Sequence, residues 1–356
     1  MAKICIQKAA YTDLPMDELL APLGGMAGFV NRGEKVLLKV NLLSGRAPEK
    51  GVTTHPALVR AVALAVKRAG GIPYIGDSPS GRFSKRVLKK AYRKSGLTDM
   101  AREENIELNR DTGSRRMVFP GAVRLKQFAV CNFVLAADKI IALPKLKTHS
   151  FQYLTLACKI MYGAIPGLSK ARYHAQFPRR AAFADMLLDV TMSLKPCLTI
   201  MDGILGMQGQ GPGNGDPVRL DWLLASPDPV AMDIAVCRLL DIEPMAIPVL
   251  KRAKVRKLWP AACDYPLLAP ADAAYRGFKL PNTTDHLLTG KKAAVKRPFI
   301  TERCIACGDC REICPKEAIE IENERASVTD AKCIRCYCCQ EVCPEDAIDL
   351  LPAGKR

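Results

Sequence analysis

The sequence predicts an α/β fold, a mostly parallel open sheet covered by helices, joined to a small α+β C-terminal domain. Over the first 240 residues, short β-branched runs alternate with segments of helical periodicity, which is typical of such a sheet. A cysteine pattern that occurs twice near the C-terminus predicts the small domain. The chain has 356 residues, of which 49% are hydrophobic and 25% charged, so it is long enough for two globular domains.

Short apolar runs predict the strands of the sheet, at residues 3–8, 35–40, 73–76, 139–143 and 197–201. Between the second and third runs, the apolar residues of HPALVRAVALAVKRAGG recur at helical spacing. Pro56 opens the first turn of this helix and Gly70 follows its last turn, as is usual at helix ends. The three segments therefore form a βαβ unit with parallel strands.

Polar residues follow several of these strands. In open sheets, ligands bind outside the carboxyl ends of the strands. Candidates for binding a substrate at this edge are Lys39, Asn41, Ser78, Lys145 and Lys147. Because ammonium and hydroxyl groups bind carboxylates and phosphates well, the sequence predicts a site for an anionic small molecule.

Candidates for catalysis are His149, His174 and Asp202. A histidine moves protons near neutral pH, and the lysines and arginines beside both histidines would keep the imidazoles neutral. Asp202 directly follows a predicted strand and could orient them. A structural role is the alternative for each histidine.

The segment DGILGMQGQGPGNGDP contributes two further candidates, Gly209 and Gly211. A glycine-rich backbone can approach a ligand closely and adopt positive φ. The segment lacks the G-x-G-x-x-G spacing of a dinucleotide site, so a substrate cradle and a plain loop are both open. Two interpretations are also open for Lys159, which either presents its amine to the site or extends to solvent.

The pattern C-x2-C-x2-C-x3-C-P occurs at residues 304–315 and again at 333–344. Domains with this spacing bind two [4Fe-4S] clusters, and the last cysteine of each repeat binds the cluster of the other repeat. The predicted ligands are Cys304, Cys307, Cys310 and Cys343 for one cluster, and Cys333, Cys336, Cys339 and Cys314 for the other.

Other uses of these cysteines fit the pattern less well. Structural zinc sites use paired C-x2-C knuckles with four ligands in all, and disulfides need an oxidising compartment. Cys338 lies within the second repeat but outside its spacing, and we interpret it as a thiol near a cluster rather than a ligand. The remaining cysteines are scattered without metal spacing, which is typical of buried reduced thiols.

The net charge of +17 is unevenly distributed. Residues 298–351 contain 12 acidic and 6 basic residues, a net charge of −6 that leaves +23 on the remainder. Opposite charges favour docking of the acidic domain on the basic one, or binding of an external electron-carrier protein. The densest basic patch lies on the predicted helix of GRFSKRVLKKAYRK, but only 6% of residues are aromatic, which makes nucleic acid the less favoured partner.

No apolar run is long enough for a membrane helix, and the first residues lack the apolar core of a secretory signal. We therefore expect a cytoplasmic protein without membrane insertion. Residues 1–242 are the predicted α/β domain and residues 298–356 the cluster-binding domain. Residues 243–297 are rich in proline and basic residues and are predicted to be a partly structured linker.

Several motifs together resemble a known family. They are KVNL, TTHPALVRAVALAVKRAGG, GDSPSG, LPKLKTH, LACKIMYGAIPG, DGILGMQGQGPGNGDP and SPDPVAMD. In this order they resemble the family called domain of unknown function 362, which often carries a ferredoxin module at its C-terminus. The cysteine repeats in turn resemble the bacterial two-cluster ferredoxins. The resemblance implies the architecture but no particular reaction.

We therefore predict an iron-sulfur electron-transfer protein. The favoured hypothesis is an oxidoreductase that passes single electrons from an external donor through two [4Fe-4S] clusters to an anionic substrate or cofactor. The alternatives are a non-enzymatic electron carrier or cluster-delivery partner, and an iron-sulfur protein that binds nucleic acid. The clusters are the only cofactors that the sequence predicts, because it contains no motif for a flavin, nicotinamide or nucleotide.

Overall fold

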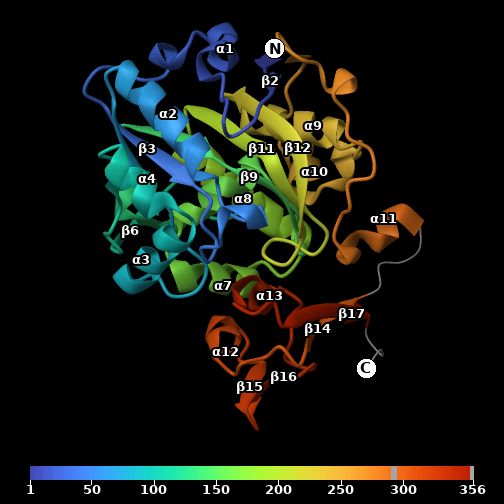
Figure 1. The fold of residues 1–356 in the computed structure, drawn as a ribbon. Coiled ribbons are helices and arrows are strands. Elements are labelled where there is room, and N and C mark those ends of the chain that lie inside the picture. Colours follow the sequence, from blue (N-terminus) through green and yellow to red (C-terminus); the bar gives the residue numbers. More distant parts are fainter. Residues whose placement is uncertain (290–294, 353–356) are drawn as a thin grey trace.

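The computed structural model describes residues 1–289 and 295–352 and has the predicted α/β class. A mostly parallel sheet lies between two layers of helices, and the C-terminal module lies below the sheet (Figure 1). The strands of the main sheet are β2 (Cys5–Lys8), β3 (Lys35–Val40), β4 (Ile72–Gly76), β5 (Glu107–Leu108), β8 (Lys139–Leu143), β9 (Lys145–His149), β10 (Tyr153–Thr155), β11 (Leu198–Gln208) and β12 (Asp216–Ser226).

The long strand β11 organises this sheet. Its first residues pair in parallel with β8, which continues through β3 and β4 to β5. Further along, β11 pairs in parallel with β9, and β9 pairs with the antiparallel β10. On its other side β11 forms an antiparallel hairpin with β12, which pairs in turn with β2. The carboxyl ends of the parallel strands therefore meet at one edge of the sheet.

Helices cover both faces of the sheet because its strands are buried on both sides. Val36, Leu38 and Val40 of β3 pack into one core, and Leu37 packs into the core on the opposite face. The first face is covered by α1 (Met16–Leu20), α2 (Pro56–Arg68), α3 (Lys85–Lys94) and α4 (Leu97–Glu103). The second is covered by α5 (Asn132–Leu135), α6 (Ala157–Ile160), α8 (Arg180–Leu194), α9 (Pro229–Leu239) and α10 (Pro248–Val255).

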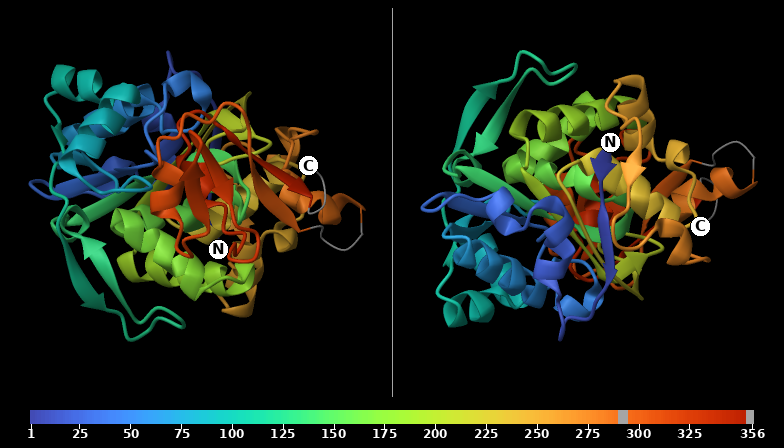
Figure 2. Two further views of the ribbon diagram at one scale, coloured as in Figure 1. Left: turned by 90° about the horizontal axis from the view of Figure 1, so that it is seen from below. Right: turned by 90° about the horizontal axis from the view of Figure 1, so that it is seen from above.

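Two smaller sheets lie beside this body. Strand β1 (Ala2–Lys3) pairs with β13 (Cys263–Asp264), and β6 (Ser114–Val118) pairs with β7 (Gln127–Cys131) in a hairpin. The hairpin extends away from the body in both views of Figure 2. At the carboxyl edge of the sheet lie the 3-10 helix η4 (Met161–Ala164) and α7 (Gly167–Gln176).

The predicted linker, residues 243–297, is partly built into the α/β body. Helix α10 buries Val249, Leu250 and Ala253 against α8 and α9, and β13 extends the small sheet of β1. Helix α11 (Asp285–Thr289) lies nearer the C-terminal module (Figure 1). This part of the chain packs because apolar residues stand at helical spacing among its lysines and arginines.

The C-terminal module is a small α+β unit with internal pseudo-symmetry. It contains β14 (Lys296–Ile300), α12 (Asp309–Ile313), β15 (Ile319–Glu322), β16 (Arg325–Val328), α13 (Cys338–Val342) and β17 (Ile348–Pro352). Strand β14 pairs with β17, and β15 pairs with β16. Positive φ occurs at Gly308 and at its counterpart Tyr337 in the second repeat. The duplicated sequence therefore adopts a duplicated backbone.

Candidate functional site

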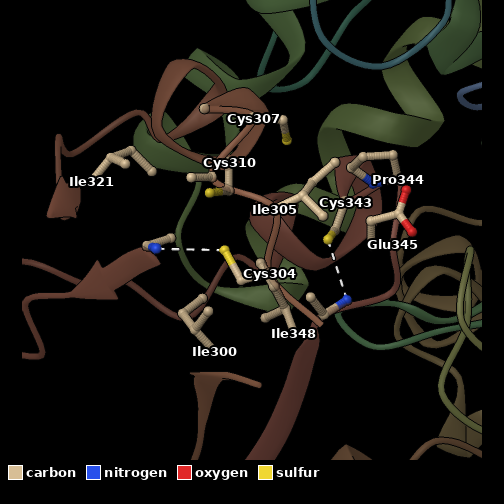
Figure 3. Close-up of a pocket in the computed structure, with 14 residues that line it drawn as sticks. Ile300, Cys304, Ile305, Cys307, Cys310, Ile321, Cys343, Pro344, Glu345 and Ile348 are labelled. Atoms are coloured by element: carbon tan, nitrogen blue, oxygen red, sulfur yellow. Dashed lines mark hydrogen bonds between the residues drawn. The ribbon is translucent and has the colours of Figure 1, made fainter. Parts of the chain in front are cut away.

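Four cysteines from both repeats line one cavity of the module. Cys304, Cys307, Cys310 and Cys343 surround about 350 Å³ of empty space, together with apolar side chains such as Ile348. Figure 3 shows their sulfur atoms around this common space. The Ala347 N–H donates to Cys343 Sγ at 3.2 Å. We call this space the first cysteine cavity.

A second cavity of about 350 Å³ is lined by Cys314, Cys333, Cys336 and Cys339, with Cys338 beside them. The Ala318 N–H donates to Cys314 Sγ at 3.3 Å, as its counterpart Ala347 does in the other repeat. Four thiols, apolar walls and N–H donors to sulfur are what an iron-sulfur cluster requires, so the residues of both cavities fit such a group. In the described part of the chain, no three histidine, cysteine or acidic side chains converge closely enough to hold a single metal ion.

The module docks on the carboxyl edge of the main sheet through α13. Tyr337 packs into the core of the α/β body, and Cys338 and Val342 contact Ala171 of α7. Helix α13 lies beside α7 in Figure 1. The guanidinium of Arg46 donates to the carbonyls of Pro344 and Cys343 at 2.8 and 2.7 Å and to Asp346 at 2.8 Å. The edge where ligands bind in such sheets is therefore covered by the module.

We expect Arg46→Met to weaken this docking. The variant removes a charged donor from two carbonyls and a carboxylate, which is worth about 2 kcal/mol. Hydrogen exchange of the α13 amides should become faster by one to two orders of magnitude. Arg82→Met is the control, because its pair with Glu312 is exposed and should contribute little. Equal exchange in the Arg46 variant and wild type would contradict a docking role.

A third cavity lies between the module and the α/β body, and we call it the inner cavity. It contains about 320 Å³ of empty space, part of which is open to solvent. Its lining comes from the loop after β4, from α6, η4 and α7, and from α12 and α13. The lining residues are Ser80, Gly81, Lys159, Tyr162, Gly167, Lys170, Ala171, His174, Ile313, Cys338, Glu341 and Val342.

Two lysines give the inner cavity a positive charge. The ammonium of Lys159 lies 5.6 Å from the centroid of the Tyr162 ring, and within the described residues it has no hydrogen-bond or ion-pair partner. The Lys159 side chain keeps some exposed area where it faces the cavity. The rest of the side chain lies deep in the protein, and this desolvation lowers the pKa of its ammonium. Lys170 donates to the Pro79 carbonyl at 3.0 Å and to Ser78 Oγ at 3.2 Å, and burial lowers its pKa to about 8.

A neutral imidazole and a carboxylate complete the polar lining. His174 stacks on Phe183, and burial together with the charge of Lys159 lowers its pKa to about 3. Its Nδ1 atom has no hydrogen-bond partner in the described structure. Glu341 accepts a hydrogen bond from the Ser80 hydroxyl. The inner cavity thus contains an ammonium and a neutral imidazole nitrogen that both lack a hydrogen-bond partner among the described residues.

Comparison with known proteins identifies both parts of the chain. The model of the family described as domain of unknown function (DUF362) matches residues 36–238, and a 4Fe-4S dicluster domain matches residues 298–344. The first match covers more than half of the chain. The chain belongs to the DUF362 family. Its C-terminal module is an iron-sulfur domain of the ferredoxin kind.

This DUF362 protein is 35% identical over 266 residues to the thylakoid-associated protein sll1697 of Synechocystis sp.. The match covers 74% of this chain and 81% of that relative. Among solved structures, the lactate racemase apoprotein of Thermoanaerobacterium thermosaccharolyticum matches with a TM-score of 0.38 and 11% identity. That match covers 64% of this chain and 55% of the racemase chain. Within the residues described for the DUF362 protein, no helix combines the length and apolar character needed to span a bilayer.

Two of the predicted substrate-binding lysines are paired within the DUF362 body. Lys39 is fully buried and donates to Asp77 at 2.6 Å. Lys145 donates to Asp202 at 2.9 Å, and both side chains are fully buried. Asp202 also accepts from the Tyr11 hydroxyl at 2.8 Å. Neither pair lines the inner cavity. Each lysine is neutralised by a carboxylate of a neighbouring strand, because Asp77 directly follows β4 and Asp202 lies within β11.

Ser78 and Asn41 lie closer to the site. The Ser78 hydroxyl accepts from the Gly167 N–H at 2.9 Å and from Lys170, so it positions two residues of the inner-cavity wall. Asn41 is half-buried next to Thr54, and its Oδ1 atom has no hydrogen-bond partner in the described structure. Ser78 thus acts on the site through neighbouring residues, and neither Ser78 nor Asn41 lines the inner cavity itself.

The glycine-rich segment forms the loop between β11 and β12 and lies against the iron-sulfur module. A Cβ atom on Gly211 would lie 2.2 Å from the Thr148 carbonyl oxygen, so this position requires glycine. The Ser150 hydroxyl lies 2.8 Å from both the Gly211 carbonyl and Gln340 Oε1 of α13. Gly209 adopts a φ of +73° at the start of the loop. The close approach of this backbone is therefore made to Thr148 of β9, and the Ser150 hydroxyl links the loop to α13.

His149 and Lys147 lie just beneath the docked module. His149 is buried, its Nδ1 accepts from the Phe151 N–H at 3.0 Å, and its Nε2 lies 3.8 Å from Glu341. Burial lowers its pKa well below the usual range, so the imidazole is neutral. Lys147 is buried as well and donates to the Val52 carbonyl at 2.9 Å, and burial lowers its pKa to about 7.

We expect Lys147 to make stability depend on pH. Its pKa is about 7 in the folded protein against 10.5 for the unperturbed side chain, so between these pH values the unfolded chain binds the extra proton. The free energy of unfolding therefore rises with pH across this window. Wild type should gain roughly 4 kcal/mol relative to Lys147→Met between pH 6 and pH 10. Urea unfolding under anaerobic conditions measures this difference, with the exposed Lys94→Met as the charge control. A constant difference across the window would contradict the assignment.

Several residues of the site are not marked by any pattern in the sequence. Glu341, Tyr162 and Arg46 carry no signal in the sequence, and Lys170 stands out only as one of the basic residues near His174. Glu341 and Arg46 acquire their roles when the two parts of the chain dock, and no local pattern marks that contact. The sequence does single out Lys159 and Cys338, and both line the inner cavity.

Proposed function

We propose that the protein transfers electrons between an external carrier protein and a small anionic ligand held in the inner cavity. One observation carries the proposal: Cys338 lines both the second cysteine cavity and the inner cavity. A single side chain therefore separates the predicted position of a redox group from the predicted position of a ligand. Electron transfer at such short range needs no further protein carrier.

The cysteines that line the two cavities are the proposed ligands of two [4Fe-4S] clusters. Cys304, Cys307, Cys310 and Cys343 would hold the first, and Cys314, Cys333, Cys336 and Cys339 the second. Such clusters supply one-electron transfer. Two such clusters would together supply the electron pair for reduction of an organic ligand, and two protons would have to arrive with it.

The inner cavity supplies the groups that such a ligand needs. Lys159 is a cation without a partner among the described residues, so an entering carboxylate or phosphate would gain a charge-assisted hydrogen bond. His174 is neutral and its Nδ1 has no partner in the described structure, so it can form a hydrogen bond with the ligand. Lys170, whose pKa is lowered to about 8, is the group in this wall that can release a proton near neutral pH. Lys170 adds positive charge from the same wall.

Electrons would enter from the opposite side of the module. Ile305, between the first two cysteines, is 61% exposed, and Cys307 is exposed as well. Glu345 lies in the wall of the same cavity, and the module as a whole is acidic. A carrier protein with a basic rim around its own redox group fits this surface. A cytoplasmic location remains a prediction.

Anaerobic stopped-flow measurements test the function. Protein reduced by dithionite is mixed with a panel of small carboxylates and phosphates, and reoxidation is followed by the absorbance of the clusters. We expect at least one small anion to reoxidise the protein with saturation kinetics. If only carrier proteins accept the electrons, the protein is a non-enzymatic carrier and the α/β domain is its docking platform.

A further inference from the structure

A second, more open cavity adjoins the inner one, and we call it the outer cavity. It contains about 830 Å³ of empty space and lies between α3 of the α/β body and α12 of the module. Its lining residues are Ser44, Gly45, Arg46, Ser80, Gly81, Arg82, Val87, Lys90, Lys94, Asp309, Glu312, Ile313, Val342 and Pro344.

The two cavities share part of their walls. Ser80, Gly81, Ile313 and Val342 line both of them. The space around Lys159 and the space beside α3 therefore adjoin each other at these four residues. A ligand that reaches the inner cavity by this route passes the side chains of α3.

Two lysines of the outer cavity are available to bind a ligand. Arg46 is occupied by the module and Arg82 by Glu312. Lys90 and Lys94 stand one turn apart on α3, and within residues 1–289 and 295–352 neither has a hydrogen-bond or ion-pair partner. The acidic lining residues are Glu312, which pairs with Arg82, and Asp309, which forms no ion pair with another described residue. The outer cavity keeps a net positive charge.

We infer that the ligand is an elongated small molecule with two anionic groups, one bound by Lys159 in the inner cavity and the other by Lys90 and Lys94 in the outer cavity. This inference rests on the proposed function and specifies its substrate class, a dicarboxylate, a bisphosphate or a phosphorylated acid. The part of the ligand that links the two anionic groups must pass the shared wall. There it would lie between the apolar Ile313 and Val342 on one side and Ser80 and Gly81 on the other. An apolar or weakly polar linker suits such a passage.

Matched pairs of ligands test this inference. Calorimetry under anaerobic conditions compares linear dicarboxylates of four to ten carbons with monocarboxylates of the same length, and alkyl bisphosphates with alkyl monophosphates. We expect the dianion to bind about tenfold more tightly than the monoanion at one favoured chain length, because two further lysine contacts are made. Shorter dianions should show no such advantage, since they cannot reach both lysine sites.

Variants on one helix separate the two ends of the ligand. Lys90→Gln with Lys94→Gln should abolish the advantage of the dianion and leave the affinity for the monoanion unchanged. Lys89→Gln with Arg93→Gln is the matched control, because those exposed residues of α3 do not line the outer cavity. Lys159→Gln should weaken binding of both ligands.

The outcomes distinguish this inference from the proposed function. Equal affinity for monoanions and dianions at every length, or the same loss in the control variant, overturns the inference while the inner site stands. If no carboxylate or phosphate binds, or if Lys159→Gln changes nothing, the proposed function itself fails.

Discussion

Cys339→Ser is expected to remove one cluster, whereas Cys338→Ser should retain both. Cys339 is the third cysteine of the second repeat and lines the second cysteine cavity with three other predicted ligands. Its neighbour Cys338 lines the same cavity but stands outside the repeated spacing. Iron content should fall from about eight to about four atoms in Cys339→Ser and stay at about eight in Cys338→Ser. Iron and sulfide analysis of anaerobically purified protein measures both values.

The first repeat provides the matched control. Cys310→Ser changes the counterpart of Cys339 and should also leave about four irons, now in the second cysteine cavity. Paramagnetic resonance of the reduced protein should then show one cluster in each single variant, without the broadening that two neighbouring clusters produce. Loss of iron from Cys338→Ser, or full iron in Cys339→Ser, would contradict the ligand assignment.

The two variants that are expected to hold one cluster, Cys310→Ser and Cys339→Ser, should differ in electron transfer. Of the two cysteine cavities, the second shares a side chain with the inner cavity, so Cys310→Ser should keep the path to the ligand and Cys339→Ser should lose it. Because Cys310→Ser holds one electron per molecule, two molecules of this variant are needed to reduce one ligand by an electron pair. Reoxidation of Cys339→Ser by a small anion is expected to be slower by at least two orders of magnitude. A carrier protein should still reoxidise its remaining cluster.

Much of the fold follows from local patterns in the sequence. Strands β3 and β8 span the predicted residues, because each is a continuous apolar run buried on both faces. Helix α2 begins at Pro56 with His55 as its N-cap, and the His55 side chain accepts from the Ala57 N–H. The predicted strand at 197–201 is in fact longer, since β11 continues to Gln208 through the hairpin with β12.

The site was only partly predictable, because pairing between distant residues decides which cations are free. Lys39, Lys145 and Lys159 look alike in the sequence, as each follows or interrupts an apolar run. The first two meet Asp77 and Asp202, which lie 38 and 57 positions away along the chain, whereas Lys159 meets the wall of the inner cavity. The position of the carboxylates is set by strand order, and no local pattern reports it. The inner cavity itself exists only where α13 docks.

Lys159→Gln is expected to abolish transfer to the ligand while the clusters remain intact. Its ammonium is the cation of the inner cavity that lacks a protein partner among the described residues. Removing one charged partner of a buried contact costs about 3 kcal/mol, which corresponds to a roughly 100-fold lower kcat/KM for the small anion. Stopped-flow reoxidation measures this, and the visible spectrum of the oxidised protein should not change.

An exposed lysine that also lies over an aromatic ring, Lys254, is the control for this variant. Lys254 belongs to α10, and its ammonium lies 5.1 Å from the centroid of the Trp259 ring. Neither residue lines the inner cavity. Lys254→Gln removes a lysine and a cation–π contact as Lys159→Gln does, yet it should leave reoxidation at the wild-type rate. Equal effects of the two variants would assign the loss to charge or packing in general.

Stability distinguishes a binding role for Lys159 from a structural one. Desolvation lowers the pKa of Lys159, so keeping this side chain in the folded protein opposes folding rather than supporting it. Lys159→Met should therefore raise the urea midpoint of unfolding while turnover is lost, since residues kept for function commonly cost stability. A structural lysine would behave in the opposite way, with a lower midpoint and retained turnover in the fraction that folds. A rise in the midpoint with turnover unchanged would show that the ligand does not contact this ammonium.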